Sequence, residues 1–361
     1  MAEITTIPFG PQHPVLPEPV HLDLELKDEK VVRAVPSIGY VHRGLEKLVE
    51  KRDFKQFTFV AERVCGICSF GHGWGYVKAV EGLMQIEVPR RASYLRTLWH
   101  ELSRIHSHLL WLGLAADAMG FESLFMHAWR LRETVLDLFE ETTGGRVIFS
   151  VCSIGGVRRD LTDTMKKDIE EKMRKLRKEL HAMGDAFVYD STIRNRLEGV
   201  GVLTAQDAVA FGCLGPMARA SGVPLDYRCA DDEGAYKELG FRPVTKTGGD
   251  CLARVEVRLA EVEQSIDLVL GCLENLPDGP IAVPVKGMPP RGEYFTRVEQ
   301  PRGEAVYYVK GNGTKNLERF RLRTPTNGNL PGLVHILQGC DLADVPNIIL
   351  TIDPCISCCE R

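Results

Sequence analysis

The chain lacks the long apolar segment that a membrane-spanning helix requires. No run of about 18 apolar residues occurs in its 361 residues, so we expect that this chain does not cross a membrane by itself. Residues 1–4 lack the basic start and apolar stretch of a secretory signal peptide. An excess of one charge is also missing, because 45 Lys and Arg oppose 49 Asp and Glu, a net charge of −4. That balance gives no reason to expect a nucleic-acid partner.

Cysteine is plentiful, yet no part of the chain carries the dense cysteine run that an iron–sulfur cluster requires. We therefore expect no iron–sulfur cluster in this chain. Eleven cysteines without a secretion signal indicate reduced thiols in the cytosol, where metal binding is more common than disulfide formation. The length and the 44% share of apolar residues are sufficient for a large buried core.

The spacing of apolar residues predicts an α+β fold that is mainly helical, with a central bundle of long helices and small flanking antiparallel sheets. Apolar residues recur every three or four positions over residues 161–187 and 252–273, which gives each helix one apolar face. Further helices are predicted to begin at Pro89 and to span about residues 122–141. Residues 213–249 are rich in Gly and Pro and predict an irregular connection.

Alternating apolar and polar residues predict strands near both ends of the chain. Residues 20–26 alternate and residues 27–30 turn the chain back into a second strand. Another hairpin is predicted over residues 305–322. No linker or repeat divides the sequence, so we expect a single domain of residues 1–361. Its parts would be an N-terminal sheet region over about residues 1–60, a helical core over about 61–275, and a C-terminal hairpin and ligand segment over about 276–361.

Two Cys-x-x-Cys pairs stand at opposite ends of the chain, Cys65 with Cys68 and Cys355 with Cys358. Four thiolates from two distant segments can surround a metal if the fold brings both ends together. One pair alone is compatible with redox chemistry, zinc or coincidence, and two pairs are also compatible with a structural four-cysteine zinc site. Such zinc sites usually close short loops, whereas nearly the whole chain separates these pairs. The other seven cysteines show no ligand spacing and are interpreted as core or incidental.

The residues around both pairs resemble one enzyme family. Residues 62–68 (ERVCGIC) with His72 resemble the N-terminal signature of nickel–iron hydrogenase large subunits, and residues 353–358 (DPCISC) resemble the C-terminal signature. The resemblance covers the whole chain and implies the large-subunit fold. Three further segments point to the energy-converting, membrane-associated branch (Ech type), which is related to the 49-kDa-type quinone-site subunit of complex I. These segments are residues 10–14 (GPQHP), 42–48 (HRGLEKL) and 101–109 (ELSRIHSHL).

The resemblance implies that the four cysteines hold a nickel–iron centre whose iron carries carbonyl and cyanide ligands. Cys65 and Cys355 would be terminal nickel ligands, and Cys68 and Cys358 would bridge nickel and iron. Soft thiolates suit such redox metals. The implied reaction is H2 ⇌ 2 H⁺ + 2 e⁻, with the Cys355 thiolate as the base. His72, one helical turn after Cys68, would hydrogen-bond a cysteine sulfur, although a histidine there is also compatible with an ordinary core role.

The family pattern also implies roles for residues outside the two pairs. Glu18 would be the next proton acceptor, with a solvent-exposed loop carboxylate as the alternative. The Arg302 guanidinium would lie over the open side of the metals and polarise bound hydrogen or hydrogen-bond cyanide, with a surface turn arginine as the alternative. Asp353 would pair with Arg302. Pro325 and Thr326 would form a segment that hydrogen-bonds cyanide, and a plain loop threonine is the alternative.

Glu46 matches a carboxylate that binds an additional divalent ion, Mg or Fe, near the C-terminus of many relatives. Their third residue after the last cysteine is usually histidine, whereas this chain has Arg361. A local salt bridge of Glu46 is therefore the alternative. Relatives are commonly cut by a protease at this position after metal insertion. We expect either that mature form or a chain encoded without an extension.

The resemblance implies partners that carry the electrons and the coupling. These are a small subunit with a 4Fe–4S cluster, ferredoxin-like subunits and integral membrane subunits that translocate ions, with ferredoxin as the expected electron carrier. The expected location is cytoplasmic, peripheral on the inner face of the cell membrane. Two other functions stay open. One is a complex I-type quinone-site subunit, a lineage that has generally lost the four thiolates, and the other is a non-catalytic scaffold with structural zinc.

Overall fold

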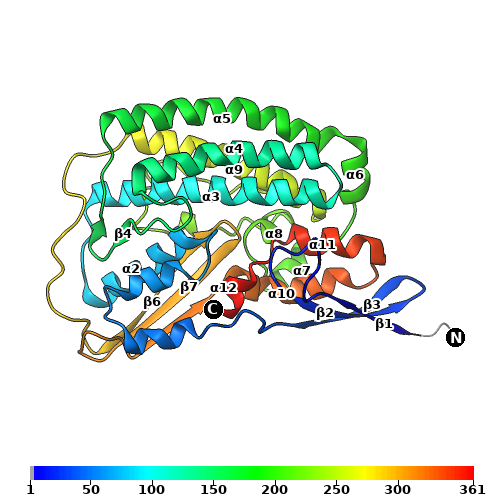
Figure 1. Ribbon diagram of the computed structural model, residues 1–361, viewed down its shortest axis with the longest axis horizontal. Helices are drawn as coiled ribbons and strands as arrows, with labels where there is room; N and C mark the ends of the chain where they lie inside the picture. Colours follow the sequence, from blue (N-terminus) through cyan, green and yellow to red (C-terminus); the bar gives the residue numbers. More distant parts are fainter. Residues whose placement is uncertain (1–3) are drawn as a thin grey trace.

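Four long helices form the bundle that the apolar periodicities predict, as the computed structural model of residues 4–361 shows (Figure 1). The expectation about a signal peptide rests partly on residues 1–3, which lie outside the described residues. Within residues 4–361, no helix combines the length and the apolar character needed to cross a membrane. The four helices are α3 (Arg90–Ala118), α4 (Glu122–Thr143), α5 (Asp163–Tyr189) and α9 (Cys251–Glu274).

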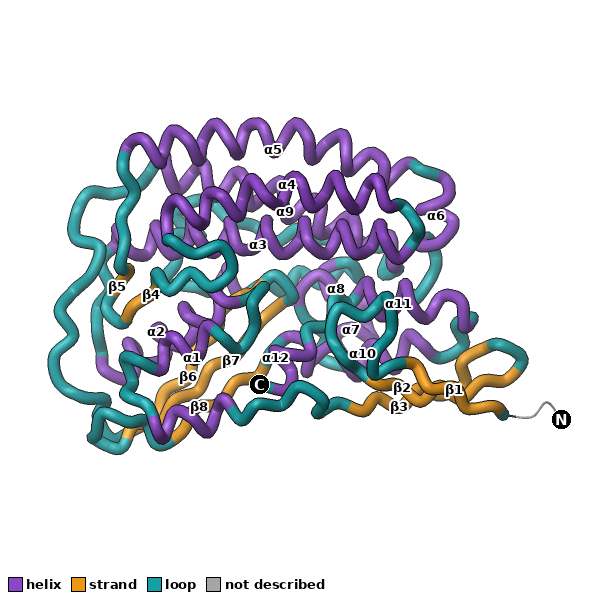
Figure 2. The backbone as a smooth tube through the Cα atoms, viewed as in Figure 1, coloured by secondary structure: helices purple, strands orange, loops and turns teal. Residues whose placement is uncertain are grey.

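Two three-stranded antiparallel sheets lie on the opposite side of the molecule from α5 (Figure 2). One consists of β1 (Thr5–Phe9), β2 (His21–Lys27) and β3 (Lys30–Ser37), and the other of β6 (Gly292–Gln300), β7 (Gly303–Gly311) and β8 (Arg319–Arg323). The predicted strand pairs β2–β3 and β7–β8 are confirmed. Strands β1 and β6 were not predicted. The predicted α+β fold, with a helical bundle and flanking antiparallel sheets, is therefore confirmed.

Short elements complete the chain and position both cysteine pairs. Helix α1 (Phe57–Glu62) precedes the first pair and α2 (Ser69–Met84) follows it. Helix α11 (Val345–Thr351) precedes the second pair, and α12 (Ile356–Glu360) begins within it. The remaining elements are η1 (Leu45–Lys51), β4 (Cys152–Ser153), β5 (Gly156–Val157), α6 (Ser191–Leu197), α7 (Ala205–Ala210), α8 (Gly215–Arg219), η2 (Tyr227–Cys229), α10 (Pro325–Leu337) and η3 (Leu342–Asp344).

Helix α3 is buried along most of its length although it carries many charged residues. Some of these polar groups meet Glu261 of α9, which also binds Arg219 of α8. Glu261 on α9 accepts a hydrogen bond from Arg219 Nε at 2.8 Å and pairs with His108 Nε2 at 2.8 Å. Burial opposes its ionisation, but the charge of Arg219 and the hydrogen bond with His108 hold the pKa of Glu261 well below its ordinary value. The bundle is therefore held together by buried polar contacts as well as by apolar contacts.

We expect Glu261→Gln to destabilise the fold by roughly 3 kcal/mol, because the buried Arg219 guanidinium loses one of its carboxylate partners and a neutral amide does not replace that charge. The matched control is Glu263→Gln on the same helix, whose partly exposed carboxylate pairs with Arg177 at the surface. That variant should lose at most about 1 kcal/mol. Denaturant titration followed by circular dichroism measures both. Equal midpoints for the two variants would contradict a stabilising role of the buried network.

Candidate metal centre

Both Cys-x-x-Cys pairs meet in one buried cluster in the interior. The Sγ atom of Cys355 lies 3.3 Å from that of Cys65 and 2.9 Å from that of Cys358. These three sulfurs lie within 4.8 Å of one another, and Cys68 packs into the same cluster. Each of the four residues is at most 4% exposed. A donor set of four converging soft sulfurs fits a nickel–iron pair, which thiolates bind in preference to hard cations.

The thiols of the cluster share protons unequally. Hydrogen bonds with Cys355, Cys358 and Cys68 hold the pKa of Cys65 well below its ordinary value. Burial, followed by the hydrogen bond with Cys355, holds the pKa of Cys358 well above it. Burial therefore favours protonated thiols in part of the cluster. A thiophilic metal cation can replace those protons, which couples metal binding to proton release.

Arg43 ties the two cysteine loops together. Its Nη1 donates to the carbonyl oxygen of Arg63 at 3.0 Å, and its Nη2 donates to that of Val64 at 2.7 Å, both in the first loop. The same Nη2 donates to the carbonyl oxygen of Ser357 in the second loop at 3.2 Å. One guanidinium thus bridges segments that are separated by most of the chain, and it fixes the spacing of the sulfurs.

Two side chains shape the second pair. Glu18 accepts hydrogen bonds from the backbone amides of Ile356 and Ser357, the latter at 3.0 Å, and from the Ser357 hydroxyl. Its carboxylate therefore satisfies the free amides at the start of α12, where negative charge is favourable. Thr326 Oγ1 accepts from the Cys355 amide at 3.0 Å, which leaves its own proton to donate. Pro325 is the first residue of α10 and brings Thr326 to this place.

Arg302 stands at the tip of the β6–β7 hairpin and reaches the cluster. Its Nη1 lies 3.3 Å from Cys68 Sγ and 3.3 Å from Ser107 Oγ, while Nη2 donates to Asp353 Oδ1 at 2.7 Å. Burial opposes its charge, but Asp353 and the sulfurs hold the pKa of Arg302 well above its ordinary value. Gly215, at φ +64°, lets the tip approach, because a Cβ there would lie 2.1 Å from the Arg302 carbonyl oxygen. The structure thus brings a fixed cation to the sulfurs.

His72 lies one turn into α2, where its amide donates to the Cys68 carbonyl at 3.0 Å. Its imidazole contacts the other pair, with Nε2 3.3 Å from Cys358 Sγ. Burial lowers the pKa of His72 to about 4, so the ring is neutral. On the far side of the ring, Nδ1 lies 3.2 Å from Gln300 Nε2 and 3.1 Å from the Tyr307 hydroxyl.

Glu46 lies away from the cluster and is fully engaged by protein donors. Arg361 Nε and the Leu322 amide each donate to its Oε1 at 2.9 Å, and Arg321 Nη1 donates to Oε2 at 2.7 Å. Burial opposes ionisation, but these hydrogen bonds, that of Leu322 first, lower the pKa of Glu46. The arginine that replaces the usual histidine therefore brings its own positive charge to this carboxylate. The structure shows the local salt bridge, and the additional divalent ion stays a prediction.

A cavity of about 390 Å³ reaches the cluster from one side. Apolar side chains, among them Ile67, Leu110 and Trp111, form much of its wall. The wall also contains three of the polar residues that were predicted to act together, and one cysteine of each pair: Glu18, Arg302, Asp353, Cys65 and Cys355. A site with an open approach can accept a small substrate, whereas a structural zinc site is closed by its protein ligands.

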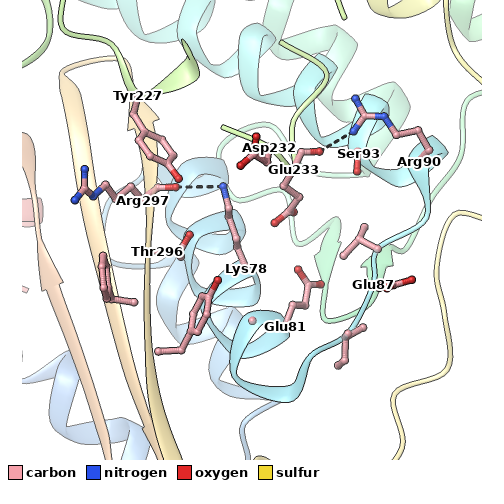
Figure 3. A pocket seen from close by; sticks show the side chains of 15 residues that line it. Lys78, Glu81, Glu87, Arg90, Ser93, Tyr227, Asp232, Glu233, Thr296 and Arg297 are labelled. Carbon is pink, nitrogen blue, oxygen red and sulfur yellow. Dashed lines mark hydrogen bonds between the residues drawn. The ribbon is translucent and has the colours of Figure 1, made fainter. Parts of the chain in front are cut away.

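A larger surface hollow of about 680 Å³ lies between α2, α3 and β6 and contains none of the predicted site residues (Figure 3). Two of its basic side chains are engaged by protein acceptors: Lys78 Nζ donates to Asp231 Oδ1 at 2.6 Å, and Arg90 Nη1 donates to the Glu233 carbonyl oxygen at 3.0 Å. We therefore place the functional site at the cysteine cluster and not at this hollow.

Known proteins share this arrangement of elements. The profile described as "Nickel-dependent hydrogenase" matches residues 43–115, and that described as "Respiratory-chain NADH dehydrogenase, 49 Kd subunit" matches residues 118–289 and 282–361. The membrane-bound hydrogenase subunit alpha of Pyrococcus furiosus is 40% identical over 98% of this chain and 87% of its own length. The chain belongs to the family of nickel-dependent hydrogenases and complex I 49-kDa subunits.

Other members of the hydrogenase and complex I family carry different names. The carbon monoxide-induced hydrogenase of Rhodospirillum rubrum is 39% identical over 99% of this chain and 99% of its own length. The F420H2 dehydrogenase of Methanosarcina mazei has a component that is 39% identical over 98% of this chain and 96% of that component. A solved chain of the membrane-bound sulfane sulfur reductase, an archaeal respiratory membrane complex, shares 32% identity at a TM-score of 0.95, over 99% of both chains. Family membership supports an oxidoreductase component of a membrane complex, and the reaction has to be argued from the site.

Some side chains that hold the site were not found from the sequence. Arg43, in the segment HRGLEKL, and Ser107, in the segment ELSRIHSHL, were quoted without a role. No role was predicted for Gln300 or Tyr307. One signal was available, because Gly71 and Gly75, one turn apart in the helix that contains His72, indicate close neighbours on that face.

Arg43→Ala should weaken metal binding by the isolated chain by roughly 10- to 100-fold, because the loss of an outer contact lets the two loops separate. Cobalt titration followed through sulfur-to-cobalt absorption measures the affinity. Arg33→Ala is the matched control, since Arg33 pairs with Glu25 at the surface. An unchanged cobalt affinity in Arg43→Ala would show that the loops keep their spacing without the guanidinium.

Proposed function

We propose that this chain is the catalytic subunit of a nickel–iron hydrogenase that interconverts molecular hydrogen with protons and electrons. The observation that carries the proposal is the convergence of Cys65, Cys68, Cys355 and Cys358 in one buried cluster next to the Arg302 guanidinium. The four thiolates would hold the metals, with carbonyl and cyanide on the iron as in the family. When bound, nickel and iron supply the redox centre at which hydrogen gives up its electrons.

The chain's own residues handle the proton. Cys355 lines the cavity beside Glu18, and the Glu18 carboxylate is hydrogen-bonded to the amide of Ile356, the next residue after Cys355. Cys355 accepts the proton that leaves hydrogen, and Glu18 passes it outward along the cavity. Arg302 supplies a fixed positive charge that Asp353 orients. Thr326 retains a hydroxyl proton that can donate to a cyanide nitrogen.

Two alternatives predict other sites. A structural zinc scaffold needs four sulfurs and no approach from solvent, whereas here a cavity lined by Cys65, Cys355 and a buried guanidinium reaches the cluster. A complex I-type quinone subunit shares the fold and needs none of the four sulfurs. The presence of all four, brought together and held by Arg43, favours the hydrogenase.

The electrons need a partner, because the chain has no cysteine run for an iron–sulfur cluster. We propose a small subunit with a 4Fe–4S cluster, ferredoxin-like subunits and a membrane arm that translocates ions. The named relatives include proteins of membrane-bound or respiratory complexes, which supports this assignment. The chain would then be peripheral on the cytoplasmic face of the membrane, attached through these subunits.

Infrared spectroscopy of the assembled complex tests the metal assignment. We expect absorption bands of metal-bound carbonyl and cyanide, in a region where protein does not absorb, together with nickel and iron in metal analysis. Removal of the metals should abolish the bands and hydrogen oxidation together. Zinc alone would indicate the structural scaffold, and a complex without metal at this site would indicate the quinone-type subunit.

Glu18→Gln should retain the metals and slow the exchange of hydrogen with deuterated water by about 100-fold or more, because an amide cannot carry the proton. The side-chain oxygen of the introduced glutamine can still accept hydrogen bonds from the backbone amides of Ile356 and Ser357, so the start of α12 stays capped. Glu29→Gln in the exposed β2–β3 turn is the control. An exchange rate equal to that of the unchanged protein would dismiss Glu18 from the proton route.

A further inference from the structure

Helix α2 presents glycines on both sides of His72, at Gly71 and Gly75. A Cβ at Gly75 would lie 2.2 Å from the Tyr307 ring, and one at Gly71 would lie 3.1 Å from Gln300 Cγ. Each glycine inside a helix costs roughly 0.5–1 kcal/mol relative to alanine. The close contacts explain why alanine does not stand here: the two gaps admit one side chain from β6 and one from β7, and both reach His72.

These two side chains form a buried clamp on the far side of the imidazole. Gln300 Nε2 donates to the Tyr307 hydroxyl at 2.7 Å and lies 3.2 Å from His72 Nδ1. The Tyr307 hydroxyl lies 3.1 Å from the same Nδ1 and 3.2 Å from the carbonyl oxygen of Gly71. His72, Gln300 and Tyr307 are all fully buried, so within residues 4–361 each ring nitrogen of His72 meets only these partners and Cys358.

The clamp selects one tautomer of the neutral ring. The Gln300 amide carries two protons, one donated to the Tyr307 hydroxyl and the other directed at Nδ1, so Nδ1 is the acceptor. The single proton of the Tyr307 hydroxyl goes to the Gly71 carbonyl oxygen, so Tyr307 acts by orienting the Gln300 amide. The ring proton then sits on Nε2, 3.3 Å from Cys358 Sγ. A thiolate that holds a metal has only lone pairs to offer, so it too requires a donor at Nε2. The partners of Nδ1 and of Nε2 therefore both favour the tautomer with the proton on Nε2.

We propose that Tyr307 and Gln300 are positioning residues that hold His72 as an Nε2–H donor to the sulfur of Cys358. A hydrogen bond to that sulfur withdraws charge from it, and the hydrogen bond that Nδ1 accepts from Gln300 makes the Nε2–H group a stronger donor. The pair thereby sets the electron density that Cys358 offers to a bound metal. The effect on metal rests on the proposed function, whereas the tautomer does not.

The tautomer is measured first, on the metal-free chain labelled with nitrogen-15 histidine, using His72→Gln to assign the signals. We expect His72 in the unchanged chain to carry its proton on Nε2. The double variant Tyr307→Phe with Gln300→Leu should lose that preference. A proton on Nδ1 in the unchanged chain, or an unaltered spectrum in the double variant, would overturn the proposal.

The consequence for the metal is measured in the assembled complex. Tyr307→Phe removes only a hydroxyl, so metal content should stay the same. The carbonyl band should shift to lower wavenumber and the midpoint potential should become more negative, because more charge stays on the sulfur. The double variant should shift both further. Tyr308→Phe is the matched control, since the neighbouring hydroxyl of Tyr308 pairs with Glu293 at the surface.

A carbonyl band in the double variant equal to that of the unchanged complex, with both metals retained, would overturn the proposal. So would an equal shift in Tyr308→Phe. If the unchanged complex shows no carbonyl or cyanide bands, the proposed function fails, and the nitrogen-15 measurement still decides whether Tyr307 and Gln300 set the tautomer. The two failures are therefore distinguishable.

Discussion

Four sulfur atoms from two distant segments must meet in a dry interior, and much of the remaining structure serves that constraint. Sulfurs that can ionise repel one another when buried, so the site needs fixed positive charge and rigid loops. Arg302 supplies the charge against Cys68. Arg43 and Glu18 supply the rigidity, one by bridging both loops through carbonyls and the other by capping the helix that carries the second pair. The protein therefore holds the two segments by hydrogen bonds to their backbone, while Arg302 and His72 contact the sulfurs directly.

The helical bundle and the metal centre are mechanically one unit. Arg104 of α3 donates to the carbonyls of Glu299 and Gln300, the last two residues of β6, and Ser107 one turn later contacts Arg302 at the hairpin tip. Helix α3 is in turn held by the buried ion pairs around Glu261. Buried ion pairs contribute little net stability but penalise alternative arrangements of their partners. Here the contacts around Glu261 fix the position of α3, and through Arg104 they fix the end of β6 that precedes Arg302.

The sequence predicted what depends on local pattern and missed what depends on distant contacts. The spacing of apolar residues was sufficient to predict the long helices and the strand pairs β2–β3 and β7–β8. The two Cys-x-x-Cys motifs were sufficient to predict the cysteine cluster. Strand β6 was missed because its first four residues are all exposed and do not show the alternation of apolar and polar residues that marks a half-buried strand. Tyr307 and Gln300 were missed because they contact His72 across more than 200 residues. The only local sign of this contact is the pair of glycines in α2, which leave room for the side chains of Gln300 and Tyr307.

The same fold serves different substrates in this family, so the backbone alone does not determine the reaction. In this chain the cavity ends on Cys65 and Cys355, one sulfur from each pair, with Glu18 and Arg302 on its wall. A quinone headgroup would need hydrogen-bond donors placed for two carbonyls, whereas hydrogen needs a soft metal, a base and an apolar approach. The sulfur pairs, the buried guanidinium and the apolar wall meet the second set of requirements. Exchange of the four sulfurs would remove the proposed metal ligands and leave the cavity and the helical frame, so one architecture is compatible with both chemistries.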